Sequence, residues 1–217
     1  MCPILAGDFM TTEFNDKQLK ILQTAEKLFA ENGFDRTSVR DIAREANVNI
    51  AMISYYFGSK EKMLEALMIS RMADLKLQLT NLANEDLSPL EKIEKLIEIY
   101  IGRICNNRGI YKIMYFELSN QQRTASVGVF SEIKKSNLEQ ITKIIREGQD
   151  KGMFNKNVNV PLIPTTIVGT FFHFNLNSAF YMELLGMKTD AELERYIKTD
   201  LTKHIQQTIK ALLLHEN

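Results

Sequence analysis

Residues that break helices are scarce in this chain, and their scarcity limits the possible folds more than any other feature. Ten glycines and four prolines occur among 217 residues, which is below the average share of these two residue types. A turn-rich β fold needs more of them, so long helices with few breaks are favoured. Residues 97–101 and 158–160 are locally β-prone, but neither stretch has a hairpin partner. The sequence therefore predicts an all-α protein.

Charge and cysteine content limit the partners and the compartment. The chain carries 27 Lys and Arg residues against 27 Asp and Glu residues, so its formal net charge is zero. A surface for nucleic acid must then be a local basic patch, because the chain as a whole is not basic. Two cysteines, Cys2 and Cys105, cannot form a disulfide framework or a zinc site. We expect a protein of the reducing cytoplasm with no metal and no other cofactor.

One uncharged segment raises the question of a membrane span. Residues 157–182 contain no Asp, Glu, Lys or Arg, and a spanning helix needs about 20 mostly apolar residues. Seven Thr, His, Asn and Ser side chains between residues 162 and 182 can form hydrogen bonds, and lipid would leave them unsatisfied. We expect a helix buried inside protein and no membrane partner. The N-terminus lacks the positive region of a secretory signal.

The first 60 residues predict three helices joined by short turns. Apolar residues at Ile21, Ala25, Leu28 and Phe29 follow the period of a helix over residues 16–31, which Gly33 ends. Residues 38–46 form a second helix, in which Asp41 completes a capping box if Ser38 is the cap; Thr37 is the other candidate cap. Asn47 suits a left-handed turn, and Asn49 can cap a third helix over residues 50–56. The remaining helices are expected at 60–83, 88–106, 110–119, 125–151, 161–185 and 190–214.

The second and third short helices match the plan of a helix-turn-helix, in which the second helix of the pair enters the major groove of DNA. Residues 36–60 hold four basic side chains and two acidic ones, a local excess of two positive charges. The alternative is an ordinary helix pair within an α-bundle, since short helix pairs are common. Outward positions are expected at Asn49, Ile50, Ala51, Met52, Ser54 and Tyr55.

Three motifs decide between these alternatives. They are A-x-x-L-F-x-x-x-G-F at residues 25–34, T-S-V-R-D-I-A at 37–43 and Y-Y-F-x-S-K-E at 55–61. Residues 20–67 closely resemble the DNA-binding domain of the tetracycline-repressor-like (TetR/AcrR) regulators. The resemblance implies a helix-turn-helix domain over residues 16–60, preceded by a flexible extension over 1–15. Residues 61–217 then form a larger helical domain for ligand binding and dimerisation.

The resemblance also implies which residues meet DNA. Thr37, Tyr55 and Lys60 would contact phosphates, and residues 49–52 would face base edges. Ile50 stands where the family often has a basic residue and Ser54 where an aromatic hydroxyl is common, so phosphate contacts at these two positions do not carry over. The expected DNA-binding residues are Thr37, Ser38, Arg40, Asn49, Ile50, Ala51, Met52, Ser54, Tyr55, Tyr56 and Lys60.

In the second domain, aromatic side chains with a few polar groups are typical of a small-molecule pocket, although aromatic residues at helical spacing also form plain cores. An apolar stripe on the last helix predicts a dimer surface, where two helices of each subunit would form a four-helix bundle, as in the resembled family. The expected pocket residues are Tyr111, Met114, Tyr115, Phe171, His173, Phe174, Asn175 and Ser178. The expected dimer residues are Leu193, Ile197, Leu201, Ile205 and Leu212.

These expectations define a dimeric regulator that binds a palindromic operator in double-stranded DNA and is released by a small hydrophobic effector. We interpret it as a repressor. An enzyme is not expected, because the sequence has no Gly-rich phosphate loop, nucleophile elbow or Glu-x-x-His metal motif. The alternative is an all-α carrier or sensor of a hydrophobic molecule without sequence-specific DNA binding.

Overall fold

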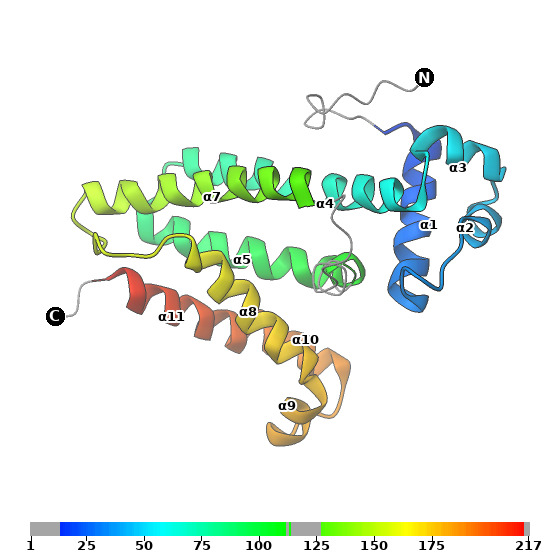
Figure 1. The fold of residues 1–217 in the computed structure, drawn as a ribbon. Helices are drawn as coiled ribbons and strands as arrows, with labels where there is room; N and C mark the ends of the chain where they lie inside the picture. Colours follow the sequence, from blue (N-terminus) through cyan, green and yellow to red (C-terminus); the bar gives the residue numbers. More distant parts are fainter. Residues whose placement is uncertain (1–13, 112, 114–126, 215–217) are drawn as a thin grey trace. The chain divides into compact units, whose positions relative to one another are not determined.

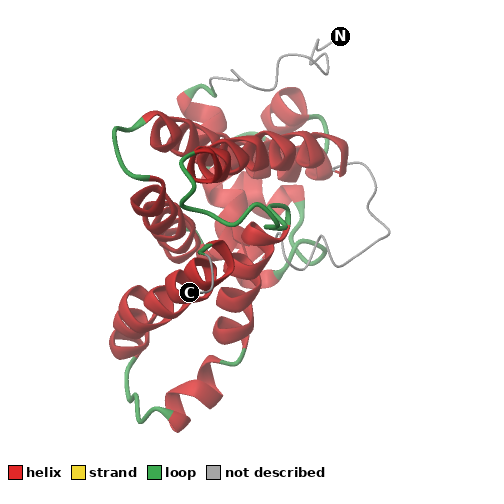
Figure 2. Ribbon diagram, turned by 90° about the vertical axis from the view of Figure 1, so that its left-hand side faces the viewer, coloured by secondary structure: helices red, strands yellow, loops and turns green. Residues whose placement is uncertain are grey.

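A computed structural model describes residues 14–111, 113 and 127–214 of the chain. These residues are helical with no strand among them, which confirms the predicted class (Figures 1 and 2). Most of the helix expected at 110–119 lies outside the described residues, as does most of the extension expected at 1–15. The helices are α1 (Asp16–Asn32), α2 (Val39–Ala46), α3 (Ile50–Phe57), α4 (Lys60–Asn84), α5 (Pro89–Asn106), α7 (Val127–Asp150), α8 (Leu162–Leu176), α9 (Ser178–Leu184), α10 (Asp190–Tyr196), the π-helical η2 (Ile197–Leu201) and α11 (Thr202–Leu213).

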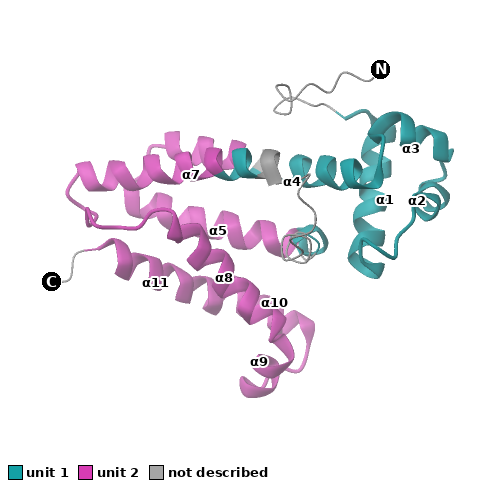
Figure 3. Ribbon diagram, viewed as in Figure 1, with its two compact units in different colours: residues 1–75, 107–134 teal, residues 76–106, 135–217 magenta. Residues whose placement is uncertain are grey.

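The chain divides into two compact units. The first contains residues 1–75 and 107–134, and the second contains residues 76–106 and 135–217 (Figure 3). The first unit therefore extends beyond the boundary expected at residue 60. The reason is that the first half of α4 carries an apolar face, with Met63 and Leu67 buried in the same core as α1, α2 and α3.

The first unit has a core to which each of its short helices contributes. Ile21 and Phe29 come from α1, Ile42 from α2, and Ile53 and Phe57 from α3. All five side chains are buried, as their helical spacing predicts. Eight-residue helices such as α2 and α3 are too short to be stable alone, so this shared core holds them in place.

In the second unit, α5, α8 and α11 pack against one another. α5 buries Ile93, Leu96, Ile97 and Ile101 at the spacing of one helix face. No helix of the described residues is long and apolar enough to cross a membrane.

The single helix expected over residues 161–185 is wrong, because the chain breaks at Asn177 into α8 and α9. Asn177 has φ −102° and ψ 23°, and its side-chain amide donates a hydrogen bond to the His173 carbonyl at 2.8 Å. Asparagine side chains compete in this way with the backbone for helical acceptors. The helix expected over 190–214 contains the π-helical turn η2, where the Thr202 hydroxyl donates to the Ile197 carbonyl at 2.8 Å.

Most residues of the expected dimer stripe on the last helix are buried within their own chain. Its residues belong to the core of their own subunit, because the apolar face of α10, η2 and α11 turns inward, where α11 packs on α5 and α8. Leu212 differs, since half of its surface is exposed. The buried members of the stripe are Leu193, Ile197, Leu201 and Ile205.

A buried lysine connects three helices of the second unit. Lys92 on α5 is only 4% exposed, and its ammonium donates to Glu147 on α7 at 2.8 Å and to the Ala83 carbonyl near the end of α4 at 3.2 Å. Lys151 also donates to Glu147, at 2.7 Å. Hydrogen bonds from Lys151 and Lys92 hold the pKa of the Glu147 carboxyl below its usual value.

Candidate nucleic-acid interface

The helix pair α2 and α3 begins with a capping box. The Ser38 hydroxyl accepts a hydrogen bond from the Asp41 N–H at 3.2 Å, and the Ser38 N–H donates to the Asp41 carboxylate at 3.1 Å. The Ser38 hydroxyl also donates to that carboxylate at 2.6 Å. These bonds hold the pKa of Asp41 below its usual value. The predicted capping box is confirmed.

A three-residue turn joins the two helices. Asn47 adopts the left-handed conformation at φ 52°, as predicted, and the Val48 N–H donates to the Ala43 carbonyl at 3.0 Å. The Asn49 side chain accepts a hydrogen bond from the Ala51 N–H at 2.8 Å and caps α3. Ile53, which is 2% exposed, fills the inner side of α3. The two helices therefore have the local geometry of a helix-turn-helix.

α3 presents an uncharged outer surface. Tyr55 is 78% exposed and Ile50 is 42% exposed. Asn49, Ala51 and Ser54 are exposed as well, whereas Met52 and Tyr56 are half-buried. The face that a DNA groove would meet is thus made of hydroxyl, amide and aliphatic groups, with Tyr55 packed edge-on against Tyr56.

The structure gives Thr37 a different role from the expected phosphate contact. Thr37 is 2% exposed, and its hydroxyl donates to the Gly33 carbonyl at 2.8 Å and lies 3.2 Å from the Leu28 carbonyl. A buried hydroxyl in this position stabilises the end of α1 and is not available to DNA. The Gly33 carbonyl lies only four residues before Thr37, whereas the Leu28 carbonyl lies nine residues before it and becomes a neighbour only in the folded unit.

Lys60 is half-buried at the start of α4 and already has internal partners. Its ammonium donates to the Phe34 carbonyl at 2.9 Å and to the Thr37 carbonyl at 3.0 Å. It also lies 4.3 Å from the centre of the Phe34 ring, within the range of a cation–π interaction. An ammonium has three N–H groups, so one remains for a phosphate.

The cations around α3 differ in how strongly they are already paired. Arg44 forms an ion pair with Asp41 at 2.9 Å, and Lys27 on α1 pairs with Glu45 at 3.1 Å. Arg36 and Arg40 are exposed, and neither has an ion pair among the described residues.

Sequence reasoning missed an ion pair that attaches α4 to α1. The Arg71 guanidinium donates to one oxygen of Glu26 through two nitrogens, at 2.6 and 3.1 Å. The Glu26 side chain is 14% exposed, so the pair is largely shielded from water. The two residues are 45 positions apart, and no local pattern signals their contact.

The expected pocket residues are distributed over both units and partly lie outside the described residues. Tyr111 packs on the core of the first unit. Phe171 and Phe174 are buried in the second unit, whereas His173 is exposed on another face of α8. Asn175 and Ser178 are half-buried, and Met114 and Tyr115 lie outside the described residues. The Phe174 ring instead stacks between Tyr181 and Tyr196, with ring centres 4.6 and 5.6 Å away.

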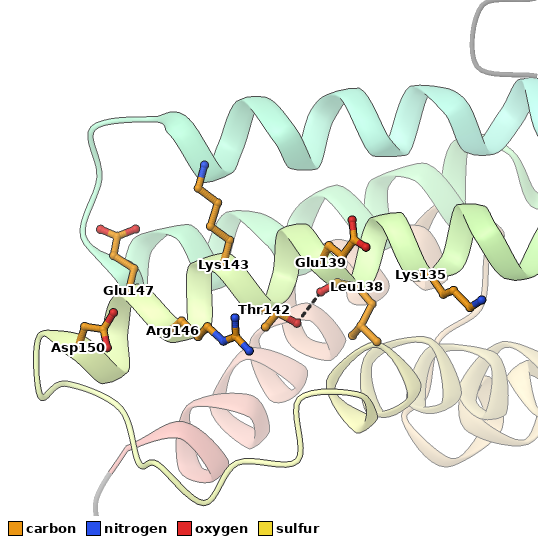
Figure 4. Close-up of a pocket in the computed structure, with 8 residues that line it drawn as sticks. All are labelled: Lys135, Leu138, Glu139, Thr142, Lys143, Arg146, Glu147 and Asp150. Atoms are coloured by element: carbon orange, nitrogen blue, oxygen red, sulfur yellow. Dashed lines mark hydrogen bonds between the residues drawn. The ribbon is translucent and has the colours of Figure 1, made fainter. Parts of the chain in front are cut away.

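A groove of about 740 Å³ runs along α7 in the second unit (Figure 4). Three basic and three acidic side chains line it, and Leu138 is its aliphatic member. Figure 4 shows Lys143 and Glu147 pointing to a different side of α7 from Leu138 and Thr142. An open, charge-balanced groove lacks the apolar walls typical of a pocket for a hydrophobic ligand.

Comparison with known families decides what this helix-turn-helix belongs to. The family described as "Bacterial regulatory proteins, tetR family" matches residues 21–67, and the family described as "Tetracyclin repressor-like, C-terminal domain" matches residues 89–209. The chain belongs to the TetR family. It is a DNA-binding regulatory protein, and the alternative of a carrier without DNA binding is not favoured.

Known relatives are similar across most of their length. The transcriptional repressor KstR2 of Mycobacterium tuberculosis is 27% identical over 159 residues, which is 72% of this chain and 78% of the repressor. The fatty acid metabolism regulator protein of Bacillus subtilis is 26% identical over 156 residues, covering 71% and 79%.

Solved structures share the fold at lower identity. The regulator FadR from Bacillus subtilis in complex with stearoyl-CoA has a TM-score of 0.71 at 22% identity, covering 87% of this chain and 95% of that one. The ketosteroid regulator KstR2 of Mycobacterium tuberculosis has a TM-score of 0.69 at 19% identity, covering 95% and 100%.

Proposed function

We propose that this TetR-family protein is a transcriptional repressor that binds a palindromic operator as a homodimer and is released by a small hydrophobic effector. The observation that carries the proposal is the outer surface of α3. Its exposed side chains have no role in the core of the unit, while Ile53 and Phe57 already fill the inner side. Such a helix, held by caps and a tight turn, is suited to the major groove, which is wide enough for one helix.

A homodimer would supply the second recognition helix that a palindrome requires. In the second unit, exposed apolar side chains lie on α8, α9 and α11, and α9 has no buried residue at all. Phe180 is 59% exposed and Leu184 is 64% exposed. Interfaces of homodimers are more apolar than the rest of a protein surface. We assign the dimer interface to exposed apolar side chains of these three helices, which include Leu162, Leu176, Phe180, Leu184 and Leu212.

The effector would act through α4, the helix that contributes residues to both units. Lys60 attaches the first half of α4 to the segment between α1 and α2, through Phe34 and Thr37, and Arg71 attaches it to α1 through Glu26. A shift of α4 would therefore move the recognition helix with it. Successive major grooves are about 34–36 Å apart, so a change in the separation of two recognition helices would release the operator.

The relatives narrow the class of effector to test first. The relative from Bacillus subtilis is a fatty acid metabolism regulator by name, and the solved FadR structure contains stearoyl-CoA. A long-chain acyl-CoA is accordingly the first candidate. A ketosteroid derivative is the second, because the solved KstR2 structure is described as that of a ketosteroid regulator.

Selection from a library of random duplex DNA tests the proposed function. The full-length protein should enrich a two-fold symmetric sequence. Tyr55→Ala, which truncates the most exposed large side chain of α3, should reduce the enrichment, whereas Lys188→Ala at an exposed position in the second unit should not. Absence of any enriched sequence with the wild-type protein would contradict the proposal.

A further inference from the structure

The recognition helix contains no charged residue. Its eight residues, Ile50–Phe57, read I-A-M-I-S-Y-Y-F. Guanine presents two acceptors in the major groove, N7 and O6, and arginine or lysine is the usual side chain that binds both. α3 offers neither, so its own side chains have no means of making that contact.

The first turn of α3 instead exposes an aliphatic surface. Ile50 is the first residue of the helix, and 42% of its surface is open to solvent. Ala51 beside it is exposed, whereas Met52 is half-buried and less available. In helix-turn-helix proteins the N-terminal residues of the recognition helix contact base edges.

Packing within the unit does not require Ile50. Ile53 and Phe57 provide the buried face of α3, and Val48 packs against the core from the turn. An exposed isoleucine at this point cannot hydrogen-bond with any base. The one apolar group that a base displays in the major groove is the 5-methyl group of thymine.

We propose that each half-site of the operator contains a thymine whose 5-methyl group packs against Ile50. This inference rests on the proposed DNA-binding function and specifies the sequence that the site prefers. Asn49 precedes Ile50 as the N-cap and Ser54 lies one turn after it, so exposed amide and hydroxyl groups beside Ile50 can supply hydrogen bonds to neighbouring groups of the DNA.

Replacement of thymine by deoxyuridine tests the inference, because the two bases differ only in the methyl group. Each thymine of the selected operator is replaced in both half-sites at once, and the affinity of the full-length protein is measured. Burial of one methyl-sized group corresponds to about a 4-fold change in affinity, so one symmetric pair of substitutions should weaken binding by about 15-fold. Uracil at other thymines should cost less than about 2-fold.

A matched pair of variants assigns the effect to its side chain. Ile50→Ala removes the proposed contact at an exposed position, so the uracil penalty at the sensitive thymine should fall below about 2-fold. Ser54→Ala, also exposed on α3, should keep the full penalty. Far-UV circular dichroism of both variants should match the wild-type spectrum.

Two results would overturn the inference while leaving the proposed function in place. One is an operator in which no uracil substitution weakens binding by more than about 2-fold. The other is a penalty that persists unchanged in Ile50→Ala, which would assign the methyl group to another residue. Failure of the wild-type protein to select any DNA sequence would remove the proposed function itself, and this inference with it.

Discussion

Replacement of Lys60 by methionine tests two roles of this side chain. One is to attach α4 through internal hydrogen bonds, and the other is to contact a DNA phosphate. Methionine has a similar length but no charge and no hydrogen-bond donor. The change removes the bonds from the ammonium to the Phe34 and Thr37 carbonyls, at 2.9 and 3.0 Å, and the interaction with the Phe34 ring. We expect a looser connection between α4 and the segment that joins α1 to α2, together with weaker DNA binding.

The magnitude follows from the geometry of Lys60. A hydrogen bond to a charged group contributes about 1.5–3 kcal/mol, and a partly exposed cation–π interaction contributes about 0.5–1 kcal/mol. A single half-buried ammonium forms both hydrogen bonds, and water can bond to the two carbonyls once the ammonium is removed. The lower ends of these two ranges therefore apply. Lys60→Met should cost about 2–3 kcal/mol of local stability, which is roughly a 30- to 150-fold larger equilibrium constant for local opening.

Native-state hydrogen exchange measures this local opening, because it reports the free energy of each segment without requiring the two units to unfold together. Amide protection in residues 34–46 should fall by the stated factor. Lys62→Met, a neighbouring exposed lysine of the same helix, is the matched control and should leave protection unchanged. If Lys60 also binds a DNA phosphate, Lys60→Met removes one contact from each chain of the dimer, so the slope of log affinity against log salt should become shallower by about 1.8.

The two readouts can contradict the reasoning independently. Unchanged protection in residues 34–46 would show that the two carbonyl bonds of Lys60 contribute nothing to the fold. Reduced protection with an unchanged salt slope would remove Lys60 from the DNA interface and leave it a purely structural residue.

Three other perturbations follow from the structure. Glu26→Gln removes the charged partner of Arg71 and should cost about 1–2 kcal/mol in chemical denaturation; a cost below about 0.3 kcal/mol would show that the ion pair does not stabilise the attachment of α4. The pKa of Glu147 is lowered by its hydrogen bonds from Lys151 and Lys92, so its contribution to stability is present above the unfolded pKa near about 4.3 and is lost as pH falls through the lower folded pKa. Glu147→Gln should therefore lose less stability than wild type between about pH 5 and pH 2, and parallel acid-denaturation curves would contradict this. The double substitution of Phe180 and Leu184 by serine should shift sedimentation equilibrium from dimer to monomer without loss of helix content, whereas an unchanged dimer would place the interface elsewhere.

Local interactions explain why much of the first unit could be predicted. The Ser38 capping box, the left-handed Asn47 and the Asn49 cap each depend on residues within three positions of one another. Their signals are therefore complete in the sequence. The break at Asn177 was equally local, since its side chain bonds to a carbonyl four residues earlier, and sequence reasoning passed over it.

Features that depend on tertiary packing could not be predicted in the same way. The stripe that includes Leu201 shows that one face of the last helix is apolar, but periodicity does not say whether its own subunit or a partner covers that face. Thr37 and Lys60 likewise carry the residue types of a phosphate contact. Their bonds reach carbonyls up to 26 residues away, which only the folded unit brings near.

The direct test of the central claim is the ratio of affinities for the selected operator and for a scrambled duplex of the same composition, measured at the same salt concentration. A sequence-specific regulator should bind the operator at least about 1,000-fold more tightly, with two protein chains per operator. A ratio below about 10, or one chain per operator, would contradict the account of α3 as the recognition helix of a dimeric repressor.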